Sequence, residues 1–219
     1  MQMPSLEELF GAYNARRAAL DQQGAYFLRD ITDDEAERFS KSLLIMSSQR
    51  KGVPEAPITI HINSGGGSVG AGFAMMEMMY KMKRDYGIVF HTIITGYAYS
   101  MGAIIFQAGD KRSMGYFSTM MLHSTQWMVS GEDQKIFQDY EKLARQYQNL
   151  IGELFARRTG QRTPAWWQRF IYSGRDRFLS PTECLKLGLV DEICSFESCY
   201  TNPSQLGQAK SSFSPSASR

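Results

Sequence analysis

A strand, a glycine-containing turn and a helix follow one another twice in the middle of this sequence. Residues 58–63 (ITIHIN) alternate apolar and polar positions, break at residues 64–67 (SGGG), and continue from Val69 with apolar residues at helical spacing. Residues 88–95 (IVFHTIIT) predict a second strand, which a turn ending at Ser100 connects to a short helix. Two such units in succession predict an α/β fold with a mainly parallel sheet.

Apolar spacing and capping signals predict further helices around these units. Thr32 and Glu35 have the spacing of a capping box, and the apolar residues that follow predict a helix of about 14 residues. Thr163 and Ser180, each followed by proline, begin two short predicted helices. The longest predicted helix, residues 132–158, is more than twice the mean length of roughly 11 residues. Its broad apolar stripe leaves two interpretations open, a core helix or a helix packed partly against another subunit.

Composition limits the number of domains and the kinds of partner. The 219 residues, 43% apolar and 21% charged, predict one domain with one substantial core. The formal net charge is +2 and the basic residues are scattered, so no nucleic-acid groove is indicated. Cys184, Cys194 and Cys199 lack zinc-ligand spacing, so we expect reduced thiols and no metal site.

The two ends of the chain differ from its middle. Residues 1–24 predict only a short helix around Leu6, and the polar, serine-rich residues 196–219 are expected to be disordered. Glu7 and Glu8 stand where a secretory signal would carry positive charge, and no apolar run approaches the roughly 20 residues needed to span a bilayer. We therefore expect no membrane association and a cytoplasmic location.

Ser100, His123 and Asp176 follow one another in an order that suits acyl transfer. A serine hydroxyl becomes a nucleophile when a neutral imidazole takes its proton, and a carboxylate stabilises the resulting imidazolium. Ser100 lies at a strand-to-helix junction (GYAYSMGA), and His123 ends a short predicted strand. Taken alone, each has a structural alternative: a buried serine in a turn, a structural histidine, or a carboxylate paired with a neighbouring arginine.

Backbone amides near Ser100 predict an oxyanion hole. The N–H of Met101, at the start of the helix after Ser100, points where an oxyanion would form, and the glycines at 65–67 can supply a second donor. Phosphate binding is the alternative for these glycines, but the Walker lysine and the G-x-G-x-x-G spacing are missing. His61 and His91 fall inside predicted strands, where a neutral imidazole satisfied by a neighbour is expected.

The segments INSGGGSVGAG, GYAYSMGA, MMLHS and GRDRFLSPTECLKLGLVDEI together resemble, in order and approximate spacing, the sequence blocks of the caseinolytic protease (ClpP) family. The resemblance covers residues 25–195. It implies an α/β superhelix of repeated strand-strand-helix units of the ClpP/crotonase type, with the long helix as an oligomerisation handle. It also implies Ser100 as nucleophile, His123 as general base and then acid, Asp176 as the orienting residue, and the amides of Gly67 and Met101 as the oxyanion hole, with no cofactor.

The same resemblance implies an endopeptidase that works through an acyl-enzyme in one heptameric ring or two stacked rings, fed by an AAA+ unfoldase. This chain departs from the family pattern in three places. Gly65 replaces a proline, residues 126–129 are bulkier than a glycine-rich handle strand, and residues 1–24 do not resemble an axial hairpin. The leading hypothesis is therefore an ATP-independent serine peptidase core that works on short or unfolded polypeptides alone or with a borrowed unfoldase.

Three other functions are weighed against this hypothesis. A catalytically silent subunit that assembles with an active paralogue is the main alternative, although this chain retains all three triad residues. An acyl-CoA enzyme of the crotonase superfamily would use similar oxyanion geometry without a Ser/His/Asp set. An α/β-hydrolase esterase is disfavoured because that class places its acid before its histidine, whereas His123 precedes Asp176 here.

Overall fold

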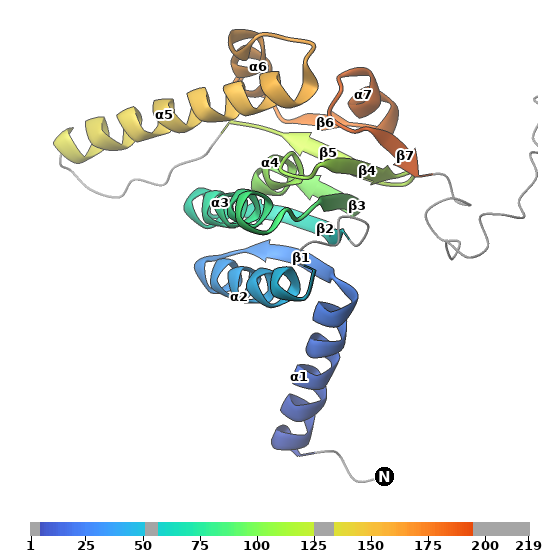
Figure 1. Ribbon diagram of the computed structural model, residues 1–219. Coiled ribbons are helices and arrows are strands. Elements are labelled where there is room, and N and C mark those ends of the chain that lie inside the picture. Colours follow the sequence, from blue (N-terminus) through green and yellow to red (C-terminus); the bar gives the residue numbers. More distant parts are fainter. Residues whose placement is uncertain (1–4, 51–56, 125–133, 195–219) are drawn as a thin grey trace, which may run out of the picture.

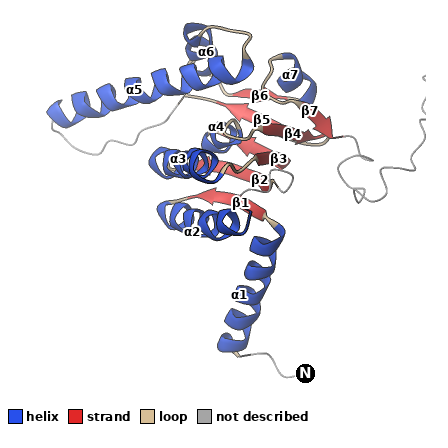
Figure 2. Cartoon of the chain, in the orientation of Figure 1, coloured by secondary structure: helices blue, strands red, loops and turns tan. Residues whose placement is uncertain are grey.

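The computed structural model describes residues 5–50, 57–124 and 134–194. In these residues, helices and strands alternate along most of the chain (Figures 1 and 2). The elements are α1 (Leu6–Gln23), β1 (Ala25–Ile31), α2 (Asp33–Arg50), β2 (Ile58–Gly67), α3 (Val69–Tyr86), β3 (Phe90–Tyr99), α4 (Met101–Phe106), β4 (Lys111–Gly115), β5 (Thr119–Leu122), α5 (Gln134–Thr159), α6 (Pro164–Ile171), β6 (Arg177–Leu179), α7 (Pro181–Lys186) and β7 (Glu192–Cys194).

The strands form one mainly parallel sheet, as the sequence predicts. Its order is β1-β2-β3-β4-β7, with every neighbouring pair parallel. Near its carboxyl end, β3 also pairs in parallel with β5, and the short β6 runs antiparallel to β5. The expected α/β class is confirmed.

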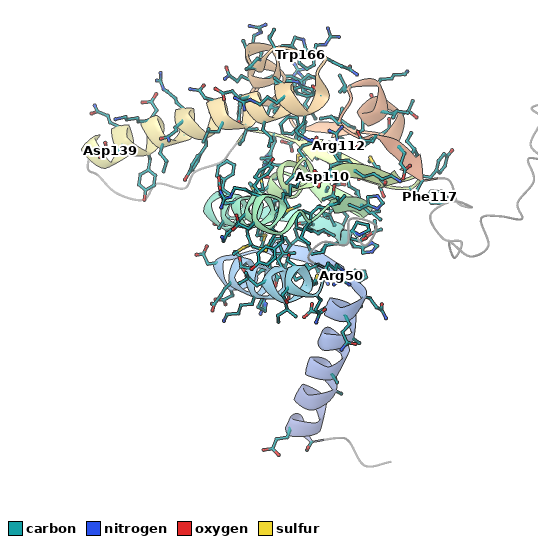
Figure 3. The ribbon with its side chains drawn as sticks, viewed as in Figure 1. Arg50, Asp110, Arg112, Phe117, Asp139 and Trp166 are labelled. Atoms are coloured by element: carbon teal, nitrogen blue, oxygen red, sulfur yellow. The ribbon has the colours of Figure 1, made fainter. Side chains whose placement is uncertain are left out.

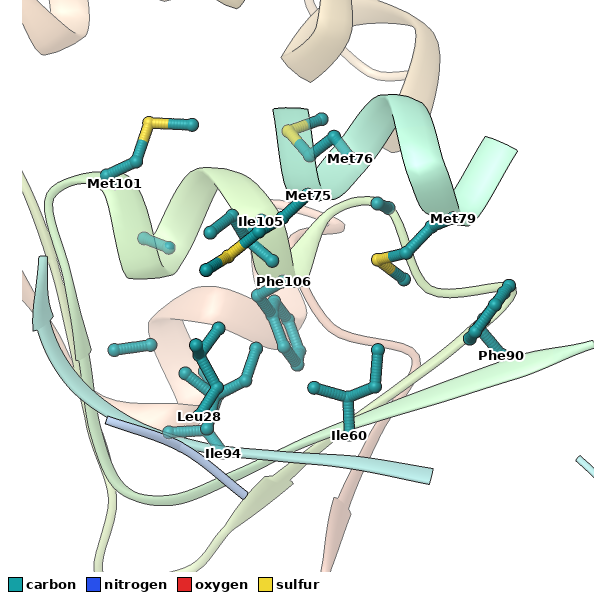
Figure 4. Packing of buried hydrophobic residues seen from close by; sticks show 14 of the residues in the cluster. Leu28, Ile60, Met75, Met76, Met79, Phe90, Ile94, Met101, Ile105 and Phe106 are labelled. Atoms are coloured by element: carbon teal, nitrogen blue, oxygen red, sulfur yellow. The ribbon is translucent and has the colours of Figure 1, made fainter. Parts of the chain in front are cut away.

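One face of this sheet carries the main hydrophobic core. Along β2, fully buried Ile58, Ile60 and Ile62 alternate with partly or fully exposed residues, because successive side chains of a strand point to opposite faces. Helices α2, α3 and α4 pack side by side against the buried face (Figure 1). Figure 4 shows methionines of α3, among them Met75 and Met79, packed above the aliphatic residues of the strands.

The helix starts at residues 163 and 180 are confirmed. Thr163 accepts a hydrogen bond from the Trp166 N–H, and Ser180 and Glu183 form a reciprocal capping box. At the start of α2, Thr32 accepts from the Glu35 N–H as expected. The helix that follows has 18 residues rather than about 14.

The N-terminal helix is longer than the sequence indicates. We expected a short helix around Leu6, whereas α1 spans 18 residues and projects from the body of the molecule (Figure 1). Its carboxyl end is held by Arg50, labelled in Figure 3, which donates to the carbonyl oxygens of Asp21 and Gln22. A cation bound to the last carbonyls stabilises a helix end, and this contact was not evident from local sequence.

The apolar stripe of the long helix α5 is buried in one part and exposed in another. Ile151 and Phe155 are fully buried, and Phe155 packs against Trp167 of α6. Tyr140 and Leu150 are exposed, and the amino-terminal part of α5 extends beyond the sheet (Figure 1). The carboxyl half of α5 is thus a core helix of this domain.

The structure also bears on the predictions for the cysteines and for membrane-spanning helices. Cys184 is a buried free thiol, but Cys194 is disulfide-bonded, so the expectation of reduced cysteines is wrong for Cys194. None of the described helices has the length and apolar character required to cross a membrane. The predicted tail (196–219) and the substituted handle segment (126–129) lie outside the described residues.

Candidate active site

Ser100 occupies a strained turn between β3 and α4. Its φ is 52°, and it is the one non-glycine residue with positive φ in the part of the chain that the structure describes. A non-glycine residue in this region costs on the order of 1–3 kcal/mol and persists only where its surroundings fix it. The Ser100 N–H donates to the Met121 carbonyl of β5 at 2.9 Å, which holds the turn against the neighbouring strand.

The parallel pairing of β3 and β5 brings His123 beside Ser100. Tyr99 pairs with Met121, so the residues that follow the two strands emerge at the same edge of the sheet. His123 Nε2 lies 2.8 Å from Ser100 Oγ, which is a normal hydrogen-bond distance. The structure therefore brings together the predicted nucleophile and the predicted base.

The antiparallel strand β6 carries Asp176 to the other side of the imidazole. Leu122 pairs with Arg177, so the residues next to them, His123 and Asp176, become neighbours. His123 Nδ1 lies 3.7 Å from Asp176 Oδ1, which is too long for a hydrogen bond, and the Asp176 side chain is 56% exposed. Arg177, a candidate partner for Asp176, instead donates to Ser173 Oγ and lies over the Phe170 ring.

The glycine turn at the end of β2 lies directly against the turn that carries Ser100. A Cβ on Gly66 would lie 2.8 Å from the Ser100 Cβ and 3.3 Å from the Met101 nitrogen, at a φ of 101°. A Cβ on Gly67 would lie 2.2 Å from the Ile31 carbonyl oxygen. Only glycine fits so close an approach of three backbone segments. The segments with both predicted oxyanion amides thus meet beside Ser100.

A pocket of about 140 Å³ opens at this junction. Its polar lining includes the two predicted triad members Ser100 and His123, together with Gly67. Its other lining residues are mainly apolar and come from α3, α4, β5, α5, α6 and the residue after α6: Val69, Met101, Ile104, Leu122, Ile151, Phe155, Ile171 and Tyr172. The arrangement suits a nucleophile that acts beside a bound apolar side chain.

The other two histidines take structural positions, as predicted. His61 stacks on Phe27 of β1, with 4.6 Å between the ring centroids, and burial lowers its pKa below the usual imidazole value. His91 Nε2 lies 2.6 Å from Ser113 Oγ. Burial, and then the nearby Lys111, lower the pKa of His91 as well. Both side chains therefore favour the neutral state.

Sequence reasoning missed the walls of the pocket. The sequence predicts only that Ile151 and Phe155 belong to the apolar stripe of the long helix at 132–158, and their position beside Ser100 follows from the packing of α5 on α6. Because these residues are four positions apart, they lie on one face of a helix, but this spacing does not identify which residues pack against that face. Within the described residues, no cluster of three His, Cys, Asp or Glu side chains could hold a metal ion.

A family model and individual relatives both show similarity to Clp proteases. A family model described as Clp protease matches residues 8–197. The ATP-dependent Clp protease proteolytic subunit 2 of Synechococcus sp. strain CC9605 is 33% identical over 165 residues, which is 74% of this chain and 78% of the relative. Proteolytic subunit 1 of Shouchella clausii strain KSM-K16 is 34% identical over 166 residues, or 75% and 80% of the two chains.

Proposed function

Because the chain belongs to the Clp protease family, we propose that it is a serine endopeptidase that cleaves unfolded polypeptides or short peptides. The single observation that carries this proposal is the 2.8 Å contact between Ser100 Oγ and His123 Nε2 in the lining of a mainly apolar pocket. A strained, half-buried serine beside an imidazole has the features of an activated nucleophile.

In the proposed reaction, Ser100 Oγ attacks the carbonyl carbon of the scissile peptide while His123 Nε2 takes the hydroxyl proton. The oxyanion of the tetrahedral intermediate accepts hydrogen bonds from the N–H groups of Gly67 and Met101. The imidazolium then protonates the leaving amine, and the acyl-enzyme remains. A water molecule, deprotonated by His123, then attacks the acyl carbon. The bond to Ser100 Oγ breaks, the imidazolium returns its proton to this oxygen, and the second product leaves as a carboxylic acid.

Asp176 has the orienting role in this scheme. Its carboxylate lies on the Nδ1 side of His123, where it favours the tautomer that leaves Nε2 free to accept the Ser100 proton. The 3.7 Å separation is longer than such a contact requires, and it is the observation that favours the alternative function, a catalytically silent subunit that assembles with an active paralogue. Approach of the carboxylate by about 1 Å would complete the relay.

The proposed assembly is a homo-oligomer built from heptameric rings in the cytoplasm. The exposed side of α5, which includes Tyr140 and Leu150, supports contacts between subunits. Peptide-bond hydrolysis at this site consumes no nucleotide, so the peptidase core is proposed to be ATP-independent. The relatives are named as ATP-dependent, and an AAA+ unfoldase that delivers folded substrates would account for such dependence here.

Fluorophosphonate labelling tests this function directly. The reagent phosphonylates an activated serine, and peptide mapping is expected to place the adduct on Ser100 and to find none in Ser100→Ala. Hydrolysis of fluorogenic peptides is expected to be lost in the same variant. Labelling that persists in Ser100→Ala would remove this residue from the mechanism. An unlabelled, inactive wild-type chain that forms rings only with another subunit would favour the silent alternative.

A further inference from the structure

Ser64, outside the predicted triad, is a buried polar residue beside the two oxyanion segments. It lies near the end of β2, where the pairing of β2 with β3 shifts register between Ile62 and Ser64. The Ser64 residue is 0% exposed, and its Oγ accepts a hydrogen bond from the Gly66 N–H at 3.1 Å. A buried hydroxyl that accepts from an amide two residues later fixes the course of the chain through a turn.

The same side chain also supports the first turn of α4. A Cβ on Gly102 would lie 3.0 Å from the Ser64 Cβ and 3.3 Å from the Ser64 Oγ. The backbone of Gly102 therefore rests on Ser64 without space for a side chain between them. Ser64 is in contact with the turn that leads to Gly67 and with the helix that begins at Met101.

These two segments are held on their outer sides as well. Gly67 pairs with Ile31 of β1, and the Ser68 N–H donates to the Ile31 carbonyl at 2.8 Å. On the other side, the Met101 side chain packs on the bare backbone of Gly72 in α3, where a Cβ would lie 2.4 Å from the Met101 Cγ. Ser64 contacts both segments, through Gly66 and through Gly102, so its side chain is placed to influence the separation of the two predicted donors.

We propose that Ser64 is a positioning residue for the oxyanion hole, which holds the N–H groups of Gly67 and Met101 at a fixed mutual spacing. This role rests on the proposed peptidase function. Oxyanion donors act at 2.7–3.1 Å from the developing charge, and a misplacement of about 1 Å can reduce the rate about 100-fold. The spacing matters most in the transition state, because the ground-state carbonyl oxygen carries little charge.

Ser64→Ala and Ser118→Ala form a matched pair for the test. Ser118 is also buried, and its Oγ also accepts from a glycine amide, that of Gly96, at 3.1 Å. Its turn lies at the other end of β5 from His123. We expect Ser64→Ala to lower kcat for a fluorogenic peptide about 10- to 100-fold with KM within about twofold. Ser118→Ala is expected to leave both constants within about twofold. Equal losses in the two variants would overturn the assignment.

Hydrogen exchange gives a readout that does not need catalysis. In Ser64→Ala, the amides of residues 64–68 are expected to exchange faster than in the wild type, and in Ser118→Ala the increase is expected around Gly96. Unchanged exchange at 64–68 would overturn the role of Ser64 even in an inactive protein. An unlabelled, inactive wild type would instead contradict the peptidase function, so the two failures are distinguishable.

Gly102→Ala tests the same contact from the side of α4. The added methyl group would approach Ser64 without removing any polar atom, and the structure leaves it only 3.0 Å from the Ser64 Cβ. We expect kcat to fall about 10-fold with fluorophosphonate labelling of Ser100 still detectable. A wild-type kcat in this folded variant would show that the spacing tolerates displacement, and would contradict the proposal.

Discussion

The described part of the chain contains two serine–histidine contacts of similar length and different character. Ser100 and His123 are 2.8 Å apart at the end of β3, and Ser113 and His91 are 2.6 Å apart between β3 and β4. The second pair is the shorter of the two, yet the chemistry that it supports is different. Proximity of a hydroxyl and an imidazole is therefore insufficient to identify a nucleophile.

The destination of the serine proton distinguishes the two pairs. Ser113 Oγ donates to Glu192 Oε1 at 2.7 Å, and because a hydroxyl has one proton, His91 must donate to Ser113 from Nε2. His91 cannot then act as the base for Ser113. Glu192 also binds Lys111, which keeps the carboxylate ionised, and Ser113 is fully buried in a regular strand.

The Ser100 pair differs in backbone and in surroundings. Ser100 has a positive φ, opens on a pocket, and lies beside the predicted oxyanion amides. A carboxylate lies on the far side of the imidazole rather than on the serine. The comparison teaches that strain, access and the position of the acid identify the candidate nucleophile better than the hydrogen-bond distance does.

Removal of each hydroxyl in turn is the strongest test of this comparison. We expect Ser100→Ala to lower kcat about 10⁶-fold and to leave the free energy of unfolding unreduced, because the strained position loses no essential partner. Ser113→Ala is expected to keep kcat within about threefold and to lower the free energy of unfolding by about 1 kcal/mol, because His91 and Glu192 lose their shared partner. Peptide kinetics and urea unfolding measure the two effects.

If the Ser113→Ala variant remains folded but no longer hydrolyses peptides, the distinction between the Ser100–His123 and Ser113–His91 pairs is contradicted. A Ser100→Ala variant that retains more than about 1% of the wild-type kcat would do the same, because the oxyanion amides alone supply a much smaller acceleration.

Exchange of the two acids for amides has the next largest expected effect. Asp176→Asn is expected to lower kcat about 10²- to 10⁴-fold, because an amide no longer stabilises the His123 imidazolium. The larger value applies if Asp176 closes the 3.7 Å gap in the substrate complex. The matched variant Glu192→Gln is expected to leave kcat within about threefold. Steady-state kinetics with one peptide substrate compares them, and equal kcat values for the two variants would show that Asp176 has no orienting role.

Acid sensitivity of folding is the smallest expected effect. The pKa of His91 is lowered, first by burial and then by Lys111, while Glu192 and Asp191 oppose the shift and His61 adds to it. The unfolded chain therefore binds more protons than the folded one below about pH 6.5. The stability that neutral His91 contributes is present above this pH and is lost as the pH falls toward the folded pKa.

Urea unfolding between pH 8 and pH 5.5 measures this loss. We expect the unfolding midpoint of the wild type to fall over this range, and that of His91→Gln to fall less steeply. His61→Gln is expected to act in the same direction, because burial also lowers the pKa of His61. Identical pH slopes in all three proteins would contradict the assignment of neutral histidines on this face of the sheet.

Local patterns predicted the elements that contain their own signals. The alternation at 58–63, the caps at Thr163 and Ser180, and the junction at Ser100 all depend on residues within a few positions of one another. The three predicted triad residues could be selected because each lies in a distinct local setting. Their convergence followed only from the pairing of β5 with both β3 and β6.

Local patterns could not predict short strands and buried polar contacts that depend on residues far apart in the sequence. Strands β4, β6 and β7 have three to five residues each, and such short segments become strands through their neighbours rather than their own propensity. In the same way, Arg112 of β4, labelled in Figure 3, is buried because Asp191 and Gln107 surround its guanidinium. The role of Ser64 depends on Gly102, which is 38 positions away.

The positive φ of Ser100 destabilises the fold at the same position where the proposed reaction needs a hydroxyl. Glycine would relax this turn, so selection for stability alone would favour loss of the hydroxyl that the proposed mechanism requires. An alcohol held in a glycine-like conformation therefore costs stability that the proposed nucleophilic role of Ser100 would explain.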